Sequence, residues 1–270
     1  MKVRIITGLI ASALVFLVVY LNTLYNITLP IVLAILAARA IYEILFNTGC
    51  VKHIPAVVVA MLYSVIAQFG YRGMFDVQIP ALIYISVIII IAVMRHDVFG
   101  AEQTTMALSM PIIISHAFGS IEKLVNHSDG YGIFYLFLVL NFSCVADAFA
   151  YFIGRAFGKH KLAPQVSPKK TIEGAVGGIV GATLCTILFV YIFESIYQVD
   201  FKLLPLLIVA PFLTILGIIG DLFFSAIKRT YNLKDYGIIM PGHGGVLDRF
   251  DSILMICPGF ALALPYLPIV

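Results

Sequence analysis

Long apolar runs separated by short connections are the feature that most constrains how this chain can fold. Nine runs are visible, at residues 5–21, 27–46, 54–70, 79–94, 106–121, 131–153, 174–193, 203–220 and 252–270. Each is close to the roughly 17–25 residues that an α-helix needs to cross a bilayer. The runs are continuous rather than alternating, which favours helices over a β-barrel. The sequence therefore predicts an all-α, polytopic integral membrane protein with about nine transmembrane helices. The fifth run is the weakest, because Pro111, Ser115 and His116 predict a kinked or partly re-entrant segment.

Composition excludes the main classes of soluble protein. Of the 270 residues, 61% are hydrophobic and 11% are charged, and the mean hydropathy is +1.05; soluble domains average about 25% charged residues. A water-soluble enzyme, a disordered chain and a nucleic-acid-binding domain are thereby excluded. The four cysteines lack C-x-x-C spacing, so neither a metal–thiolate site nor a disulfide framework is expected. Lys2 and Arg4 could begin a signal peptide, but the long first run lacks an obvious cleavage site, which predicts a retained helix.

Lysine and arginine are distributed unequally between the two sides that nine helices would define. With the N-terminus inside, the outer set is Arg72, Lys123 and Lys202, and the inner set is Lys2, Arg4, Lys52, Arg95, Arg155, Lys159, Lys161, Lys169, Lys170, Lys228, Arg229, Lys234 and Arg249. The positive-inside rule favours this orientation. It predicts a multi-pass protein of the cell inner (plasma) membrane. The N-terminus and the two long polar loops, 154–173 and 221–251, would be cytoplasmic.

The first polar loop follows a helix that carries an acid. Ser143, Asp147 and Tyr151 are spaced i, i+4, i+8 and share one helix face, and a carboxylate inside a membrane helix usually faces a cavity or a partner. Thr171 with Glu173 predicts the start of the next helix, and a helix N-terminus beside two lysines can bind phosphate. Two plainer interpretations stay open: an Asp that only fixes helix packing, and a basic patch that attracts anionic lipid head groups.

The seventh run has a face of small residues. Gly174, Gly177, Gly178 and Gly181 have overlapping G-x-x-x-G spacing. This spacing lets another helix approach closely. It predicts helix packing, and it permits dimerisation without requiring it.

The second polar loop combines carboxylates, cations and glycines. If the eighth helix continues beyond its apolar run, Asp221, Ser225 and Lys228 fall on one face. Asp248 and Asp251, spaced i, i+3, could converge at the start of the ninth helix. Carboxylates among cations favour a divalent ion that bridges phosphates, and Mg²⁺ usually takes one or two carboxylates plus substrate phosphates.

A glycine-rich stretch, Pro241–Gly245, lies within the same loop. Glycines allow the backbone N–H groups of such a stretch to turn toward phosphate oxygens. A zinc site at His243 is disfavoured, because no other His or Cys lies at metal-ligand spacing. The alternative, a solvated charged connection, is less consistent with so many acids and glycines at a membrane surface.

The run S-A-I-K-R-T-Y-N-L-K-D-Y-G-I-I-M-P-G-H-G-G-V-L-D-R-F-D, Ser225 to Asp251, resembles the signature of CDP-diacylglycerol synthases (phosphatidate cytidylyltransferases). All fixed positions of S-x-x-K-R, four residues, K-D and P/G-x-H-G-G-x-x-D-R-x-D are filled. The run from Asp147 to Gly174 is similar to the family's second block, with Lys169 where many members carry Gly. The resemblance covers the C-terminal half, so residues 131–270 are expected to form the catalytic transmembrane region. Residues 1–130 would supply N-terminal transmembrane helices.

The resemblance implies a nucleotidyltransferase of phospholipid biosynthesis. Its reaction converts CTP and phosphatidic acid to CDP-diacylglycerol and pyrophosphate, with Mg²⁺ and room for a second cation. The implied partners are the two substrates, the lipid bilayer and a second copy of the chain in a homodimer, and no nucleic acid. Because a phosphate monoester is already a nucleophile at neutral pH, no Ser-His-Asp arrangement is needed, and none is visible in the sequence.

The resemblance also assigns roles to residues. The expected metal ligands are Asp221 and Asp248, with Asp147 and Asp251 as second ligands or their partners. The residues expected to act in catalysis are Asp221, Asp248, Lys228, Arg229, Lys234 and Asp251. The residues expected to bind the nucleotide are Lys169, Lys170, Ser225, Gly242, His243, Gly244, Gly245 and Arg249.

Two other functions fit parts of the pattern. A CTP-dependent kinase acting on a polyprenol or another lipid would need similar metal and phosphate groups. A transporter could use Asp147, Arg39 and Glu43 within its helices. Arg39 and Glu43 are spaced i, i+4 and are expected to pair with each other. The charges cluster on one side of the membrane rather than at its middle, which disfavours transport.

Overall fold

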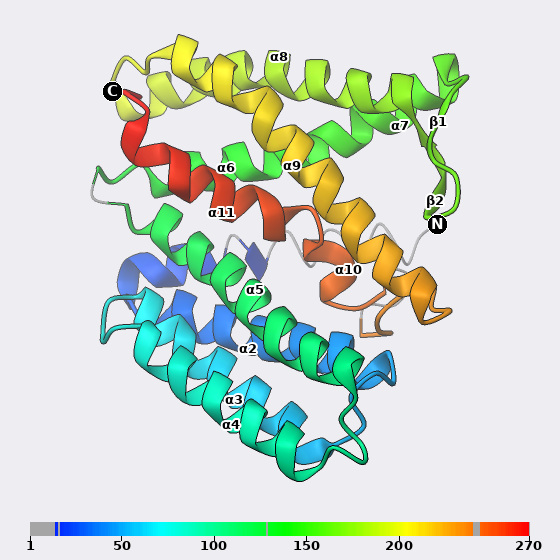
Figure 1. Ribbon diagram of the computed structural model, residues 1–270. Coiled ribbons are helices and arrows are strands. Elements are labelled where there is room, and N and C mark those ends of the chain that lie inside the picture. Colours follow the sequence, from blue (N-terminus) through cyan, green and yellow to red (C-terminus); the bar gives the residue numbers. More distant parts are fainter. Residues whose placement is uncertain (1–13, 16, 128, 240–243, 270) are drawn as a thin grey trace. The chain divides into compact units, whose positions relative to one another are not determined.

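The fold of the chain was analysed in a computed structural model, which describes residues 14–15, 17–127, 129–239 and 244–269 (Figure 1). The regular elements of these residues are helical apart from one short hairpin, so the all-α prediction is confirmed. The chain forms two compact units. The first comprises Met1–Lys123 with Lys228–Phe250, and the second comprises Leu124–Ile227 with Asp251–Val270.

Most of the predicted apolar runs are helices. In the described part of the chain, six segments are long and apolar enough to cross a membrane: Thr28–Asn47, Ile54–Tyr71, Ala101–Val125, Gly132–Phe157, Ile172–Tyr197 and Leu203–Thr230. The fourth and ninth runs form the shorter apolar helices Gln78–Met94 and Ile253–Tyr266. Most of the first run lies outside the described residues. The total of nine transmembrane helices therefore stays a prediction.

The first unit is built on closely packed apolar helices. Its elements are α2 (Thr28–Tyr42), the π-helical turn η1 (Glu43–Asn47), α3 (Ile54–Tyr71), α4 (Gln78–Met94), α5 (Ala101–Val125) up to its last turn, and α10 (Leu247–Phe250). Helices α2 and α3 pack together, and each buries small residues, among them Ala37 and Ala60. Small side chains allow helix backbones in a membrane to approach closely.

The fifth run lies in one continuous helix, α5. It has 25 residues and contains Pro111, so the re-entrant alternative is wrong, and the kinked alternative stays a prediction. Proline is tolerated in membrane helices because neighbouring groups satisfy the freed backbone. The Gln68 side chain of α3 donates a hydrogen bond from Nε2 to the carbonyl oxygen of Ser115, at 3.1 Å. Polar contacts of this kind hold α5 within the first unit.

The second unit contains the remaining helices and the hairpin. Its elements are α6 (Gly132–Leu140), the π-helical turn η2 (Asn141–Val145), α7 (Ala146–Phe157), β1 (Lys161–Ala163), β2 (Ser167–Thr171), α8 (Ile172–Tyr197), α9 (Leu203–Thr230) up to Ile227, α11 (Ile253–Ala263) and η3 (Leu264–Tyr266). The apolar run that predicted the eighth helix ended at residue 220. The helix itself continues to Thr230, as the motif analysis required.

Helices α7 and α8 lie side by side along the predicted small-residue face (Figure 1). A Cβ added at Gly177 would lie 2.5 Å from Cδ1 of Ile153, and one at Gly181 would overlap the ring of Phe149. Helix α8 therefore uses its glycines to pack against α7 of the same chain. The packing prediction is confirmed.

The start of α8 is also as predicted. Thr171 caps the helix, and its Oγ1 accepts a hydrogen bond from the N–H of Gly174 at 3.1 Å. The hairpin before it pairs Lys161 with Thr171 and Ala163 with Ser167. This hairpin was not predicted from the sequence; it places Lys169 and Lys170 on β2 directly before the cap.

Candidate active site

A cavity of about 360 Å³ lies within the second unit. It is lined by residues of η2, α7, the hairpin, α8 and α9, together with Ser252. The charged residues of its lining are Asp147, Arg155, Lys169, Lys170 and Asp221. Its volume lies in the range of about 300–1,000 Å³ that is usual for ligand sites. We call this cavity the pocket; it combines acids and cations in an otherwise apolar helical unit.

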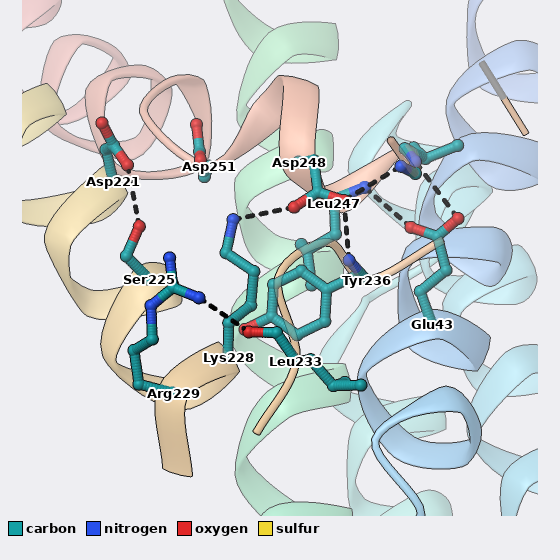
Figure 2. A network of polar contacts seen from close by, with 12 residues as sticks. Glu43, Asp221, Ser225, Lys228, Arg229, Leu233, Tyr236, Leu247, Asp248 and Asp251 are labelled. Carbon is teal, nitrogen blue, oxygen red and sulfur yellow. Dashed lines mark hydrogen bonds and ion pairs between the residues drawn. The ribbon is translucent and has the colours of Figure 1, made fainter. Parts of the chain in front are cut away.

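Asp221 is the acid that α9 contributes to the pocket. Its Oδ2 accepts a hydrogen bond from Nζ of Lys170. Its Oδ1 accepts one from Oγ of Ser225 at 3.1 Å (Figure 2). The side chains of Asp221 and Lys170 are 21% and 26% exposed. A carboxylate has about four acceptor positions. Asp221 can therefore bind a ligand in the pocket while it keeps its two protein partners.

Asp147 is the acid that α7 contributes, and its side chain is exposed. Ser143, Asp147 and Tyr151 all line the pocket, as their shared helix face predicted. Ser143 lies in the π-helical turn η2, which directly precedes α7. Asn141 of the same turn donates hydrogen bonds from Nδ2 to the carbonyl oxygen of Ala182 at 2.9 Å and to Oγ1 of Thr186 at 3.1 Å. Single π-helical turns are frequent at functional sites. This one joins α6 to the helix that carries the acid.

Four polar pocket residues were missing from the predicted site: Arg155, Thr171, Thr214 and Ser252. Arg155 lies eight residues after Asp147, and its Nη1 donates a hydrogen bond to the hydroxyl of Tyr151 at 3.3 Å. The i, i+4, i+8 spacing that grouped Ser143 with Asp147 could have found it. Thr214 and Ser252 also line the pocket. Thr214 lies seven residues before Asp221 on α9, so it too shares a helix face with a predicted residue.

A second polar cluster lies within the first unit and is centred on Asp248, which is 7% exposed. The Asp248 Oδ1 accepts a hydrogen bond from Nζ of Lys228 at 2.7 Å, and Oδ2 accepts from the N–H groups of Tyr236 at 2.7 Å and Gly245 at 2.9 Å (Figure 2). The Lys228 ammonium also lies 5.3 Å from the centre of the Tyr236 ring. We call these four residues the Asp248 cluster. Both oxygens of its carboxylate have protein donors.

Glu43 of η1 is fully buried and reaches the same turn of chain. It accepts hydrogen bonds from the N–H groups of Val246 at 3.1 Å and Leu247 at 2.9 Å (Figure 2). Its Oε1 also lies 3.2 Å from Nε of Arg39, so the predicted pair is confirmed. The backbone contacts were not predicted. Each joins two residues that are far apart in the chain, with separations of 203 and 204 positions.

The remaining predicted site residues take various positions. Arg229 is exposed and donates a hydrogen bond from Nη1 to the carbonyl oxygen of Leu233 at 3.0 Å. Lys234 and Arg249 are exposed as well. Asp251 belongs to the second unit, where its Oδ1 accepts a hydrogen bond from the N–H of Ser252 at 2.8 Å. Gly244 lies beside the Asp248 carboxylate, whereas Gly242 and His243 lie outside the described residues.

Tyr231 lies inside the signature run and faces α5. Its hydroxyl donates a hydrogen bond to Oε1 of Glu102 at 2.6 Å. Burial raises the pKa of Tyr231, and its contacts with Cys50 and Glu102 raise it further. Burial likewise raises the pKa of the Cys50 thiol. Both groups therefore stay protonated near neutral pH, and neither can act there as a base or an anionic nucleophile.

The donor set of the pocket is suited to a hard cation. Among the described residues, no three His, Cys, Asp or Glu side chains are grouped so as to hold a metal ion by themselves. The pocket offers two carboxylates, Asp147 and Asp221. A Mg²⁺ ion needs only one or two carboxylates when substrate phosphates and water complete its shell. The residues present therefore fit Mg²⁺ that is bound together with a nucleotide.

Comparison with known proteins gives the family. The sequence profile of the cytidylyltransferase family matches residues 2–267. The chain belongs to the cytidylyltransferase family. It is 33% identical over 265 residues to the phosphatidate cytidylyltransferase of Bacillus subtilis, covering 96% of this chain and 95% of that protein. The corresponding proteins of Staphylococcus haemolyticus and Staphylococcus saprophyticus are 35% and 34% identical over 266 and 263 residues, with 96% of each chain covered.

These comparisons confirm the family predicted from the signature and the enzyme class that it implied, a nucleotidyltransferase. They also extend the similarity. The signature covered only the C-terminal half of the chain, whereas the relatives match nearly all of it. The N-terminal helices are therefore a regular part of this family.

Proposed function

We propose that this cytidylyltransferase transfers the cytidylyl group of CTP to phosphatidic acid and releases pyrophosphate. The observation that carries the proposal is the pocket, where Asp147 and Asp221 lie among Arg155, Lys169 and Lys170. Both substrates are polyanions, and one is a lipid. A site with cations for phosphates and carboxylates for a metal ion, built from membrane-type helices, suits both substrates.

The proposed reaction is an in-line displacement at phosphorus. An oxygen of the phosphatidate phosphate attacks the α-phosphorus of CTP, and a new P–O bond forms. The bond between the α-phosphorus and the bridging oxygen of the β-phosphate breaks, and pyrophosphate leaves with the electron pair. No proton has to be removed from the nucleophile. Catalysis then consists of positioning and of stabilising the charge that develops on phosphate oxygens.

Asp221 and Asp147 are the proposed ligands of Mg²⁺ in the pocket. When bound, the ion supplies positive charge to the phosphate oxygens and fixes their orientation. Lys170 now pairs with Asp221. On substrate binding, Lys170 would turn to a phosphate oxygen, and Asp221 would turn to the cation. Lys169 and Arg155 would hold the remaining phosphate charge of CTP or of the lipid head group.

The signature supports roles for residues outside the pocket. We propose that Asp248, with Asp251 as a further ligand or partner, contributes to a second cation. The proposed phosphate contacts of the signature run are Ser225, Lys228, Arg229, Lys234, Gly242, His243, Gly244, Gly245 and Arg249. For Asp248 and Lys228 this role requires the pair that they now form to open, because each is the charged partner of the other.

We also propose nine membrane crossings, with the N-terminus and the loops 154–173 and 221–251 in the cytoplasm of the cell. The enzyme would be a multi-pass protein of the inner (plasma) membrane and a homodimer. The support for the orientation is the excess of lysine and arginine in those loops.

Product analysis tests the proposed activity. Purified protein is supplied with phosphatidic acid, CTP and Mg²⁺, and we expect CDP-diacylglycerol and pyrophosphate in equal amounts. Release of CDP with a newly phosphorylated lipid would instead indicate a CTP-dependent lipid kinase. The absence of any CTP-derived product would remove the proposal and reopen a transport function.

Cysteine labelling tests the orientation. Single cysteines replace Lys159, Asp235 and Lys202, all exposed, in a background without the four native cysteines. We expect a membrane-impermeant thiol reagent to reach Lys202→Cys from outside intact cells. The other two should react only after the membrane is opened. Labelling of Lys159→Cys or Asp235→Cys from outside would contradict the orientation.

A further inference from the structure

Glu43, an acid of the N-terminal helices, has no direct role in the proposed reaction. Its carboxylate is 0% exposed, so burial has to be offset by specific partners. Only one of these, Arg39, is a cation, at 3.2 Å. The other two are the N–H groups of Val246 and Leu247. Most of the hydrogen bonding of this acid is therefore directed at one backbone turn in the signature run.

Two glycines of that run, Gly237 and Gly245, lie directly against the Glu43 carboxylate. A Cβ added at Gly245 would lie 2.6 Å from Cδ of Glu43, and one at Gly237 would lie 2.6 Å from its Oε1. Real Cβ atoms are not found so close to other atoms, so any side chain at either position would displace the acid or the turn. The two glycines thus let the backbone approach Glu43 on both sides.

The turn that Glu43 holds also forms the Asp248 cluster. The N–H of Gly245 donates to Asp248, and the next two N–H groups along the chain donate to Glu43. Consecutive amides of one turn therefore point at two different carboxylates, and moving one of these amides moves the others. Asp248 in turn fixes the ammonium group of Lys228 at 2.7 Å.

We propose that Glu43 is a positioning residue: by holding the amides of Val246 and Leu247, it sets the geometry in which Asp248 and Lys228 are presented. The inference rests on the proposed function in one respect, because it assumes that Asp248 and Lys228 take part in the reaction. It gives the N-terminal helices a task in catalysis beyond crossing the membrane. It also gives the glycines at 237 and 245 a structural role, which for Gly245 is separate from its proposed phosphate contact.

The substitution Glu43→Gln tests the inference, because it preserves the size of the side chain. A glutamine has one acceptor oxygen, and its NH₂ group would face one of the two backbone N–H donors. The matched control is Glu122→Gln, which removes another buried acid of the first unit. Glu122 pairs with Arg72 at 2.6 Å and is 2% exposed.

Two measurements are made on both variants: amide hydrogen exchange over residues 244–250, and steady-state kinetics with CTP. For Glu43→Gln we expect exchange over this segment to be at least tenfold faster, and kcat to fall at least tenfold. KM for CTP should stay within about twofold. For Glu122→Gln we expect wild-type exchange over the segment and wild-type kcat, whatever its thermal stability. Unchanged exchange in Glu43→Gln, or equal acceleration in both variants, would overturn the inference.

A second variant keeps the test decisive if Glu43→Gln does not accumulate as folded protein. Gly245→Ala keeps the Glu43 residue but puts a methyl group against its carboxylate, so that the acid or the turn must shift. We expect it to show the same faster exchange and the same loss of kcat, whereas wild-type behaviour would overturn the inference. The proposed function can fail separately: if the wild-type enzyme makes no CDP-diacylglycerol, the exchange measurements still decide whether Glu43 holds the turn.

Discussion

Asp221 and Asp248 are both acids of the signature region, yet their surroundings differ in kind. Asp221 lines a cavity, is partly exposed and has one lysine and one hydroxyl as partners. Asp248 is buried, and its two oxygens receive one lysine and two backbone N–H groups. The first is an open centre with acceptor capacity left for a ligand. The second is a closed centre, which is buried and held by three protein donors.

The two acids belong to the same sequence motif, but the difference suits them to different tasks: binding a ligand and holding the local structure in place. An open carboxylate can change partner at little cost, because solvent and ligand already reach it. A closed carboxylate holds its surroundings in place, because removing one member of a buried pair leaves the other unsatisfied. We therefore expect substitutions at Asp221 to act mainly on turnover. Substitutions at Asp248 should act on stability as well.

The largest effect is expected for Asp221→Asn. The substitution keeps the size of the side chain but removes the negative charge proposed to bind the cation. Turnover should fall about a thousandfold, equivalent to about 4 kcal/mol of transition-state stabilisation, while thermal stability changes little. Ser225→Ala serves as the control, because it removes only the hydroxyl contact to Asp221, and it should cost less than tenfold. Turnover of Asp221→Asn within tenfold of wild type would exclude it as a metal ligand.

Asp248→Asn should lower turnover about a hundredfold and should also destabilise the protein. The Lys228 ammonium would lose its charged partner in a buried position, and breaking a buried ion pair costs about 3–5 kcal/mol. The free energy of unfolding and the rate of CDP-diacylglycerol formation are measured on the same preparation. If Asp248→Asn loses turnover at wild-type stability, the closed and open centres do not differ in the way described.

The lysines in and next to the hairpin should show a smaller loss of activity than the two acids. Lys170 contacts Asp221, and an arginine fork does not replace a compact ammonium group faithfully. We expect Lys170→Arg to lower kcat/KM more than tenfold, about 1.4 kcal/mol. Lys159 and Lys161 do not line the pocket, so the same change at either should stay within about twofold. Equal effects at all three positions would indicate a general electrostatic patch instead of a defined phosphate site.

The smallest effect is expected for Thr171→Ala at the start of α8. Loss of the cap to the N–H of Gly174 should lower the free energy of unfolding by about 1 kcal/mol. Turnover should fall only a few-fold, because the cap borders the pocket without contributing a charge. Thermal unfolding and CDP-diacylglycerol formation are again compared. A loss of turnover as large as that of Lys170→Arg would give Thr171 a direct role.

Local patterns in the sequence predicted much of this fold. Apolar runs predicted the described helices, and Thr171 predicted the start of α8. Helical spacing placed Ser143, Asp147 and Tyr151 on one face, which is the face that lines the pocket. These features depend on residues a few positions apart, where helix geometry determines which side chains are neighbours.

Features that depend on distant segments were not predicted. The contact of Glu43 with the backbone at Leu247 joins residues 204 positions apart and involves a main-chain group that no sequence motif displays. The partners of Asp248 likewise depend on how the chain turns at Tyr236 and Gly245. The two π-helical turns were also missed, because a run that is apolar on all sides shows no periodicity that one extra residue could interrupt.

The glycine-lined contact between α7 and α8 has a consequence for how this enzyme would respond to random mutation. Gly177 and Gly181 are absent from the pocket lining, yet both allow α8 to pack closely against α7, the helix that carries Asp147. A single methyl group at Gly177 would overlap the side chain of Ile153 on that helix. In a saturation library selected for activity, these two positions should tolerate almost no replacement. Such a library would group the two glycines with the catalytic residues, although their contribution to activity is helix packing.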